Sequence, residues 1–168
     1  MDVAGIADAR TAACGYGRGM ARQPRCVLPE IAVFHVTGRG VAGDAIYRDD
    51  QDRFRFASLL RLAALRWRWQ IFAYCLMTNH FHVVVLGELE CVSRGMHLLN
   101  FRYAQRFNER HERRGHLFQE RFHARVIRDD EHLVSACEYV LDNAVRAGLC
   151  ASRDDWPWLG GELVDDLR

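Results

Sequence analysis

The sequence predicts an α+β domain in which helices pack on one face of a ferredoxin-like, four-stranded antiparallel sheet. Two observations lead to this class. Short apolar runs typical of strands are interleaved with longer segments of helical periodicity. Their order along the chain is β-α-β-β-α-β-α, and only two residues separate the second and third strands. This order is typical of an antiparallel sheet with helices layered against it.

The spacing of apolar residues changes between the first predicted strand and the first predicted helix. Residues 31–37 (IAVFHVT) form an apolar run that predicts a buried strand, closed by the Gly-Arg-Gly that follows. Asp49 and Asp50 can then cap a helix, because their carboxylates accept bonds from its first N–H groups. Apolar residues recur after them at helical spacing: Phe56, Leu59, Leu60, Ala63 and Trp67.

The remaining elements follow from the same signals. Residues 70–77 (QIFAYCLM) and 80–86 (HFHVVVL) are rich in strand-forming residues, and their short separation predicts a tight hairpin. A second helix is expected from about Val92 to Arg110, and a fourth strand within residues 112–127. Asp129 or Asp130 can then open a third helix that runs to about residue 143.

The length of 168 residues and the 49% hydrophobic content suit a single domain, expected over residues 26–158. Residues 1–25 are rich in Ala, Gly and Arg without periodicity and are expected to be a disordered leader, with Met20 as an alternative start. Residues 159–168 are expected to be a flexible tail.

The sequence predicts a cytoplasmic protein. No segment is long and apolar enough for a membrane span, and the first residues lack the apolar core of a signal peptide. The six cysteines show no C-x-x-C spacing, which indicates reduced thiols and disfavours a zinc ribbon or a disulfide scaffold.

The distribution of charge is more informative than its total. The chain has 23 basic and 22 acidic residues, and every basic residue is an arginine, the side chain best suited to bidentate phosphate contacts. The segment 102–128 holds eight arginines against three acidic residues. A solvated, salt-bridged helix face and a GC-rich genome are the ordinary explanations. Alternatively, the stripe Arg102, Arg106 and Arg110, with Arg113 and Arg114 beyond it, could follow a nucleic-acid phosphate backbone.

His80 and His82 are the first residues in the chain whose pattern indicates a possible reactive or metal-binding site. Residues i and i+2 of a strand point to one face, so both imidazoles should project together while Phe81 and Val83 enter the other side. Two converging imidazoles can hold a divalent cation and leave positions open for phosphate oxygens and water. Two exposed histidines beside a turn are the alternative, so a third ligand is needed to support a metal site.

The third helix carries a tyrosine outside its expected apolar stripe. The stripe consists of Leu133, Val134, Cys137, Val140 and Leu141. Tyr139 lies away from these residues, with Asn143 beside it one turn later. An exposed tyrosine is the ordinary interpretation. The functional hypothesis is that the phenol attacks a phosphodiester while the Asn143 amide oxygen completes the metal site, because a cation would stabilise the transition state.

Five stretches in order resemble the REP-associated tyrosine transposases, a branch of the single-tyrosine HUH transposases. They are HVTGRG (35–40), AYCLMTNHFHVVV (73–85), RYAQRFNERHERRGHLFQERF (102–122), EYVLDNAVRAGL (138–149) and DWPW (155–158). The resemblance covers residues 20–158. Thr78 and Ala144 depart from it, because proline is usual at both positions.

The resemblance implies a role for each matching residue. His80 and His82 match the metal histidines, Tyr139 the nucleophile, and Asn143 the polar residue that helps to hold the metal. It implies magnesium or manganese as cofactor and cleavage of single-stranded, hairpin-containing DNA, leaving a 5′-phosphotyrosine and a free 3′-hydroxyl. Members are monomers or homodimers. The expected DNA contacts are Arg39, Arg102, Arg106, Arg110, Arg113, Arg114 and Arg121.

Two alternatives remain open. A ferredoxin-like sheet with basic helices also suits a noncatalytic protein that binds single-stranded DNA or RNA. A metal-dependent phosphodiesterase that activates water would leave Tyr139 without a role.

Overall fold

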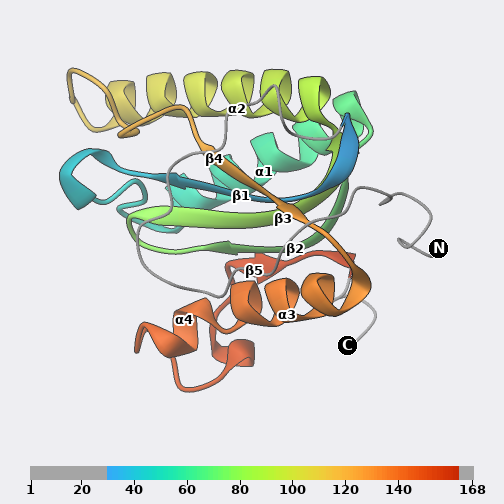
Figure 1. Cartoon of the computed structure of the whole chain (residues 1–168). Coiled ribbons are helices and arrows are strands. Elements are labelled where there is room, and N and C mark those ends of the chain that lie inside the picture. Colours follow the sequence, from blue (N-terminus) through green and yellow to red (C-terminus); the bar gives the residue numbers. More distant parts are fainter. Residues whose placement is uncertain (1–29, 163–168) are drawn as a thin grey trace.

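The computed structural model describes residues 30–162, which form one sheet between two layers of helices (Figure 1). Five strands pair antiparallel in the order β4-β1-β3-β2-β5. Their bounds are β1 Ile31–Arg39, β2 Gln70–Leu76, β3 His80–Glu88, β4 His123–Ile127 and β5 Leu159–Gly160. The leader expected at residues 1–25 lies outside the described residues.

Four helices complete the fold. Their bounds are α1 Asp50–Trp67, α2 Leu89–Arg110, α3 Asp130–Leu141 and the short α4 Asn143–Arg146. Asp49 and Asp129 cap α1 and α3, each accepting a bond from the backbone N–H three residues on, as the sequence predicted. The two-residue hairpin between β2 and β3 is also confirmed, with the Met77 N–H bonded to the His80 carbonyl.

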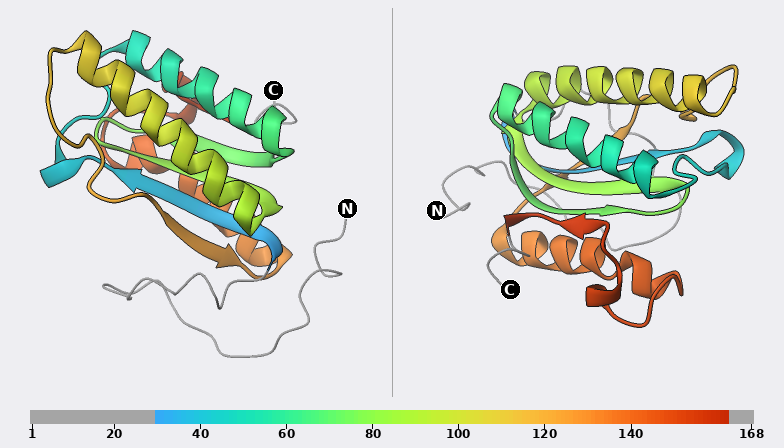
Figure 2. Two further views of the ribbon diagram at one scale, coloured as in Figure 1. Left: turned by 90° about the horizontal axis from the view of Figure 1, so that it is seen from above. Right: turned by 180° about the vertical axis from the view of Figure 1, so that it is seen from behind.

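The helices lie on both faces of the sheet. Helices α1 and α2 cover one face, and α3 with α4 covers the other (Figure 2). The α+β class and the antiparallel sheet are therefore confirmed, but the expectation that all helices share one face is corrected. The central strands are apolar on both sides, with Phe34 and Val83 buried toward α1 and α2 and Val33 and Val84 buried toward α3. A sheet of this kind needs two covering layers.

The core under α3 corrects one residue of the predicted stripe. Val134 is 55% exposed, whereas Ala136 is fully buried beside Cys137 and Val140. The buried side of α3 is thus rotated toward Tyr139, which is partly buried and packs against this core. A small residue at position 136 lets the helix approach the sheet closely.

The fifth strand involves residues that the sequence placed in the tail. Leu159 and Gly160 pair with Cys75 and Tyr74 of β2, and Leu159 is buried. The Trp156 indole N–H donates to the Leu76 carbonyl, which anchors the same edge. Within residues 30–162, no helix combines the length and apolar character that a membrane span requires.

Candidate active site between the sheet and α3

His80 and His82 project from β3 toward the face that α3 covers. Their ring centroids are 5.0 Å apart, and the intervening Phe81 and the following Val83 are fully buried in the opposite core. The alternation expected from the sequence is therefore confirmed. His82 is buried, whereas His80, at the start of the strand, is half-buried.

Tyr139 reaches the same place from α3. Its ring centroid lies 5.8 Å from that of His82 and 6.1 Å from that of His35, edge-on to both. The rotation of α3 described above brings this about, because the tyrosine borders the buried side of the helix instead of pointing to solvent. The fold thus brings together an imidazole pair and a phenol from distant parts of the chain.

His35 also belongs to this group, although its sequence context predicted no role for it. It lies on β1, and its Nε2 is 2.9 Å from Nδ1 of His82. Thr37 is the residue paired with His82, so His35 is a diagonal neighbour on the same face of the sheet. The available signal was a polar side chain at an inward position of an otherwise apolar strand.

His80 also has a hydrogen-bond partner at Nδ1. Its Nδ1 lies 2.7 Å from the Asn79 side-chain oxygen, while the Asn79 amide N–H donates to the Gly43 carbonyl at 2.9 Å. Asn79 thus connects His80 to the short 3-10 turn Val41–Gly43 that follows β1.

All three imidazoles are held in their neutral form. Burial is the main cause, and it lowers the pKa of His82 to about 2 and that of His35 to about 4. Burial also lowers the pKa of His80, aided by the positive charge of Arg39. Neutral imidazole is the form that can bind a metal ion, so these rings need lose no proton to do so near neutral pH.

Asn143 follows Tyr139 by one helical turn at the junction of α3 and α4. Its side chain is buried, and its amide N–H donates to the Tyr139 carbonyl at 2.8 Å. This bond is made by the amide nitrogen. The amide oxygen, which is the atom that can ligate a cation, takes no part in it.

A family model described as "Transposase IS200 like" matches residues 44–143, well over half of the chain. The chain belongs to the IS200-like transposases. No curated protein gives a match. This transposase also resembles a solved structure of a REP-associated tyrosine transposase bound to a REP hairpin, with a TM-score of 0.55. The two are 14% identical over 88% of this chain and 82% of that chain, a level at which the likeness establishes a shared fold.

Three arginines of the transposase lie beside the histidines or the tyrosine. Arg39 is paired with His80 across β1 and β3, and Arg125 with His35 across β4 and β1, so each shares a sheet face with its histidine. The guanidinium of Arg146 lies 5.4 Å from the Tyr139 ring centroid. Only Arg39 was among the DNA contacts expected from the sequence, because the other two belong to no periodic stripe.

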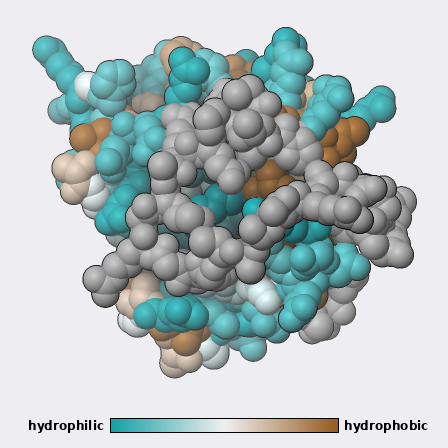
Figure 3. Space-filling view, in the orientation of Figure 1, coloured by the Kyte–Doolittle hydropathy of each residue, from teal (hydrophilic) through white to brown (hydrophobic). Residues whose placement is uncertain are grey.

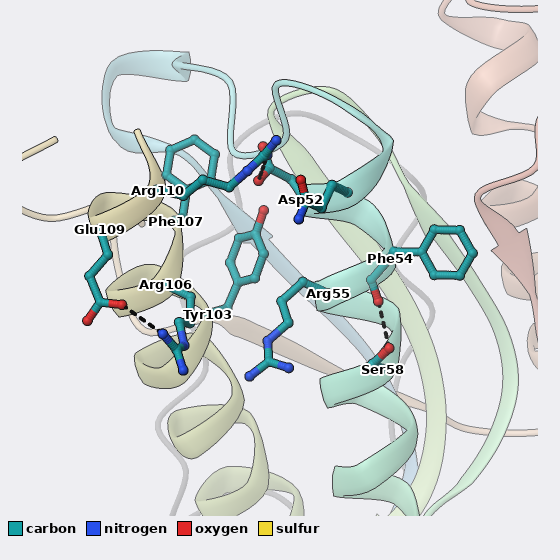
Figure 4. Close-up of a pocket in the computed structure, with 10 residues that line it drawn as sticks. Asp52, Phe54, Arg55, Ser58, Tyr103, Arg106, Phe107, Glu109 and Arg110 are labelled. Atoms are coloured by element: carbon teal, nitrogen blue, oxygen red, sulfur yellow. Dashed lines mark hydrogen bonds and ion pairs between the residues drawn. The ribbon is translucent and has the colours of Figure 1, made fainter. Parts of the chain in front are cut away.

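The arginines of α2 lie on the other side of the sheet. Hydrophilic side chains protrude along the side of the molecule that α2 occupies, at the top of the space-filling view (Figure 3). Arg102 and Arg106 are exposed, and Arg106 lines a pocket between α1 and α2 (Figure 4). Arg106 forms an exposed ion pair with Glu109 at 3.1 Å. These side chains cannot contact the same nucleotide as Tyr139, because the sheet separates them.

Arg110 departs from the predicted stripe. Its guanidinium donates to Asp52 at 2.7 Å (Figure 4) and to Asp49 at 2.7 Å. The nearly inaccessible Asp52 carboxylate also contacts His111 at 2.9 Å. The hydrogen bond from Arg110 is the main cause that lowers the pKa of Asp49 to about 2. We refer to Asp49, Asp52, Arg110 and His111 as the α1–α2 ion-pair cluster. Arg110 therefore joins the two helices, with its guanidinium bonded to two carboxylates.

The other predicted contacts lie between α2 and β4. Arg113 bonds the His116 carbonyl at 3.0 Å and the Asn108 side chain at 3.3 Å, and it is partly buried. Arg114 and Arg121 are exposed. Two of these three arginines are thus accessible to a ligand.

The donor set at the site suits a magnesium or manganese ion only in part. Among residues 30–162, no group of three or more His, Cys, Asp or Glu side chains is arranged as a metal site. Two neutral imidazoles would leave several positions to other ligands, such as an amide oxygen, water or substrate oxygens. Such an incomplete set fits a cation that is shared with a phosphate.

Proposed function

We propose that this transposase cuts and rejoins single-stranded DNA through a covalent bond to Tyr139. The observation that carries the proposal is the meeting of the Tyr139 ring with His82 and His35 at 5.8 and 6.1 Å, across strands and a helix far apart in sequence. A phenol packed beside neutral imidazoles, with the Arg146 guanidinium against its ring, suits attack on a phosphodiester.

The proposed reaction is a transesterification. The Tyr139 oxygen forms a bond to the scissile phosphorus while the bond from phosphorus to the 3′-oxygen of the preceding nucleotide breaks. The phenol loses its proton and the departing oxygen gains one, so the products are a 5′-phosphotyrosine and a free 3′-hydroxyl. Attack by a 3′-hydroxyl reverses these steps and rejoins the strand, so no nucleotide cofactor is needed.

The neighbouring residues bind and orient the phosphate. His80, His82 and Asn143 would hold a magnesium or manganese ion, which when bound stabilises the charge that develops on the phosphate. Arg39, Arg125 and Arg146 would attract the strand to the tyrosine, since arginine matches phosphate geometry. The buried imidazoles also keep water from one side of the site.

The proposed substrate is single-stranded DNA that carries a hairpin. The solved transposase with the same fold is bound to a REP hairpin, which supports a structured strand as the ligand. Arg102, Arg106, Arg114 and Arg121 would then contact the hairpin at a distance from the cut.

The test is the formation of a covalent adduct. The full chain is incubated with a labelled single-stranded hairpin oligonucleotide and manganese, and the products are separated under denaturing conditions. We expect a labelled protein band that Tyr139→Phe abolishes. Tyr74→Phe is the matched control, because Tyr74 packs against the core on the other face of the sheet and should leave the band intact.

Other outcomes would replace the proposal. Cleavage without an adduct would favour a water-activating phosphodiesterase, and binding without cleavage would favour a noncatalytic nucleic-acid-binding protein. Unchanged cleavage in both His80→Ala and His82→Ala would show that the metal is not held there.

A further inference from the structure

Among residues 30–162, each histidine of the pair has a neighbour bonded to one ring nitrogen and none bonded to the other. For His80 the engaged atom is Nδ1, bonded to Asn79, and for His82 it is again Nδ1, bonded to His35. A neutral imidazole carries its proton on one nitrogen and a lone pair on the other, so the partner of Nδ1 decides which nitrogen can bind an electrophile.

The bond to Asn79 fixes the proton of His80. The Asn79 amide contacts the Gly43 carbonyl at 2.9 Å, and a carbonyl only accepts, so the atom facing it must be the amide nitrogen. The Asn79 oxygen therefore faces His80 and accepts the Nδ1 proton across 2.7 Å. The lone pair of His80 is then on Nε2.

The bond between His35 and His82 has two possible directions. If His35 donated its Nε2 proton, His82 would accept at Nδ1 and carry its own proton on Nε2. If His35 accepts, His82 has the same tautomer as His80, and both rings present an Nε2 lone pair. Only the second arrangement gives the pair two equivalent ligand atoms.

We propose that His35 and Asn79 are positioning residues that hold His82 and His80 as Nδ1–H tautomers, leaving an Nε2 lone pair on both rings. The inference rests on the proposed function, in which these rings hold a metal ion. Ligating histidines generally donate their other ring N–H to an acceptor, and removal of that acceptor weakens metal binding by roughly 10–100-fold.

The fold makes both positioning contacts rigid. His35 is held in the middle of β1, between β3 and β4, where its backbone is paired on both sides. Asn79 is tied to the turn after β1 through Gly43. One strand and its following turn thus orient both rings of β3, which explains how a two-histidine motif at a hairpin can be preorganised.

The direct test is the tautomer of each ring in the metal-free full chain. Two-bond proton-nitrogen correlation spectra of the ¹⁵N-histidine-labelled protein at one fixed pH distinguish Nδ1–H from Nε2–H. We expect Nδ1–H for both His80 and His82. In His35→Leu, which has no acceptor, His82 should shift toward Nε2–H, whereas His35→Gln, whose side chain can still accept, should keep Nδ1–H.

Two controls separate orientation from general damage. His97→Leu removes an exposed histidine of α2 on the other side of the sheet and should leave the His82 signals unchanged. Asn79→Asp keeps the acceptor for His80 and should preserve its tautomer, whereas Asn79→Ala should not. An Nε2–H tautomer for His82 in the unmodified protein, or its indifference to His35→Leu, would overturn the inference.

Manganese binding then tests the consequence. Calorimetry with manganese alone should show affinity roughly 10–100-fold weaker for His35→Leu than for the unmodified chain, and near-normal affinity for His35→Gln. Equal affinity in all three proteins would overturn the positioning role. If the spectra match expectation but the unmodified chain binds no manganese, the positioning inference stands and the proposed metal-dependent function fails.

Discussion

Burying an imidazole away from anionic partners favours its neutral form, and His35 and His82 share this situation. Their pKa values are lowered to about 4 and about 2, mainly by burial. The unfolded chain, with ordinary histidine pKa values near 6.5, therefore takes up protons first as the pH falls. The stability that the neutral rings contribute is complete above pH 6.5 and is lost progressively below it.

We therefore expect the free energy of unfolding of the metal-free protein to fall between pH 6.5 and 5. Each of the two residues contributes up to about 1.4 kcal/mol per pH unit over this range. Urea unfolding at pH 7, 6 and 5 in the presence of a chelator measures the slope. His35→Gln should reduce it, because the variant removes one titrating group. Identical slopes for the two proteins would show that His35 takes up its proton as readily folded as unfolded.

At the scale of elements, the α1–α2 ion-pair cluster joins the first turn of α1 to the last turn of α2. Asp52 is nearly inaccessible and bonds Arg110, His111 and the Arg48 backbone N–H. Loss of one partner of a buried carboxylate leaves part of its desolvation uncompensated. Arg110 thus belongs to the packing of the two helices, although its position in the sequence continues an apparent phosphate-binding stripe.

Arg110→Ala should accordingly lower the urea midpoint of unfolding, because the buried Asp52 carboxylate loses a partner. Arg106→Ala, which removes only an exposed pair with Glu109, should change stability by less than about 1 kcal/mol. The expected order for DNA affinity is the reverse, with Arg106→Ala having the larger effect on the folded protein. A stable Arg110→Ala protein with a large loss of DNA affinity would contradict the structural role.

Helix α3 shows how an element is located by contacts that its own sequence does not reveal. The spacing of Leu133, Cys137 and Val140 predicted the helix and most of its buried side. The sequence could not show which of Val134 and Ala136 is buried, because their burial depends on how closely the helix approaches the sheet. That small rotation decides whether Tyr139 points to solvent or to His82.

At the scale of the whole molecule, the sheet divides the arginines into two groups. Arg146 lies beside the Tyr139 ring and Arg125 beside His35, whereas Arg102 and Arg106 are exposed on α2, across the sheet. If Arg102 and Arg106 bind a DNA hairpin, its single strand must pass around the sheet to reach Arg125 and Arg146. The two groups should therefore affect different steps.

We expect a combined Arg125→Ala and Arg146→Ala variant to slow single-turnover cleavage of bound oligonucleotide by at least tenfold. A combined Arg102→Ala and Arg106→Ala variant should weaken hairpin binding and lower its salt dependence by roughly one unit of slope per lost phosphate contact, with little effect on cleavage at saturation. Affinity comes from titrations at several salt concentrations, and cleavage from quenched time courses. If both variants impair the same step equally, the two groups do not act separately.

Local sequence determined the elements and much of the candidate site. Periodicity, the Asp caps and the two-residue turn act between residues close in the chain, so β1, α1, the hairpin, α2 and α3 could be predicted, together with the shared face of His80 and His82. The motifs of the chain also indicated its family. These features depend on propensity and alternation, which a sequence displays directly.

Only the tertiary structure decided which distant groups meet. It placed α3 opposite α1 and α2, added Leu159 and Gly160 to the sheet, gave His35 to His82 as a partner, and joined Arg110 to α1. Each of these depends on packing between segments separated by tens of residues, where burial and pairing are set by the whole fold. His35 is a polar residue in an apolar strand, and its local sequence shows no partner for it. In the folded protein its partner is His82.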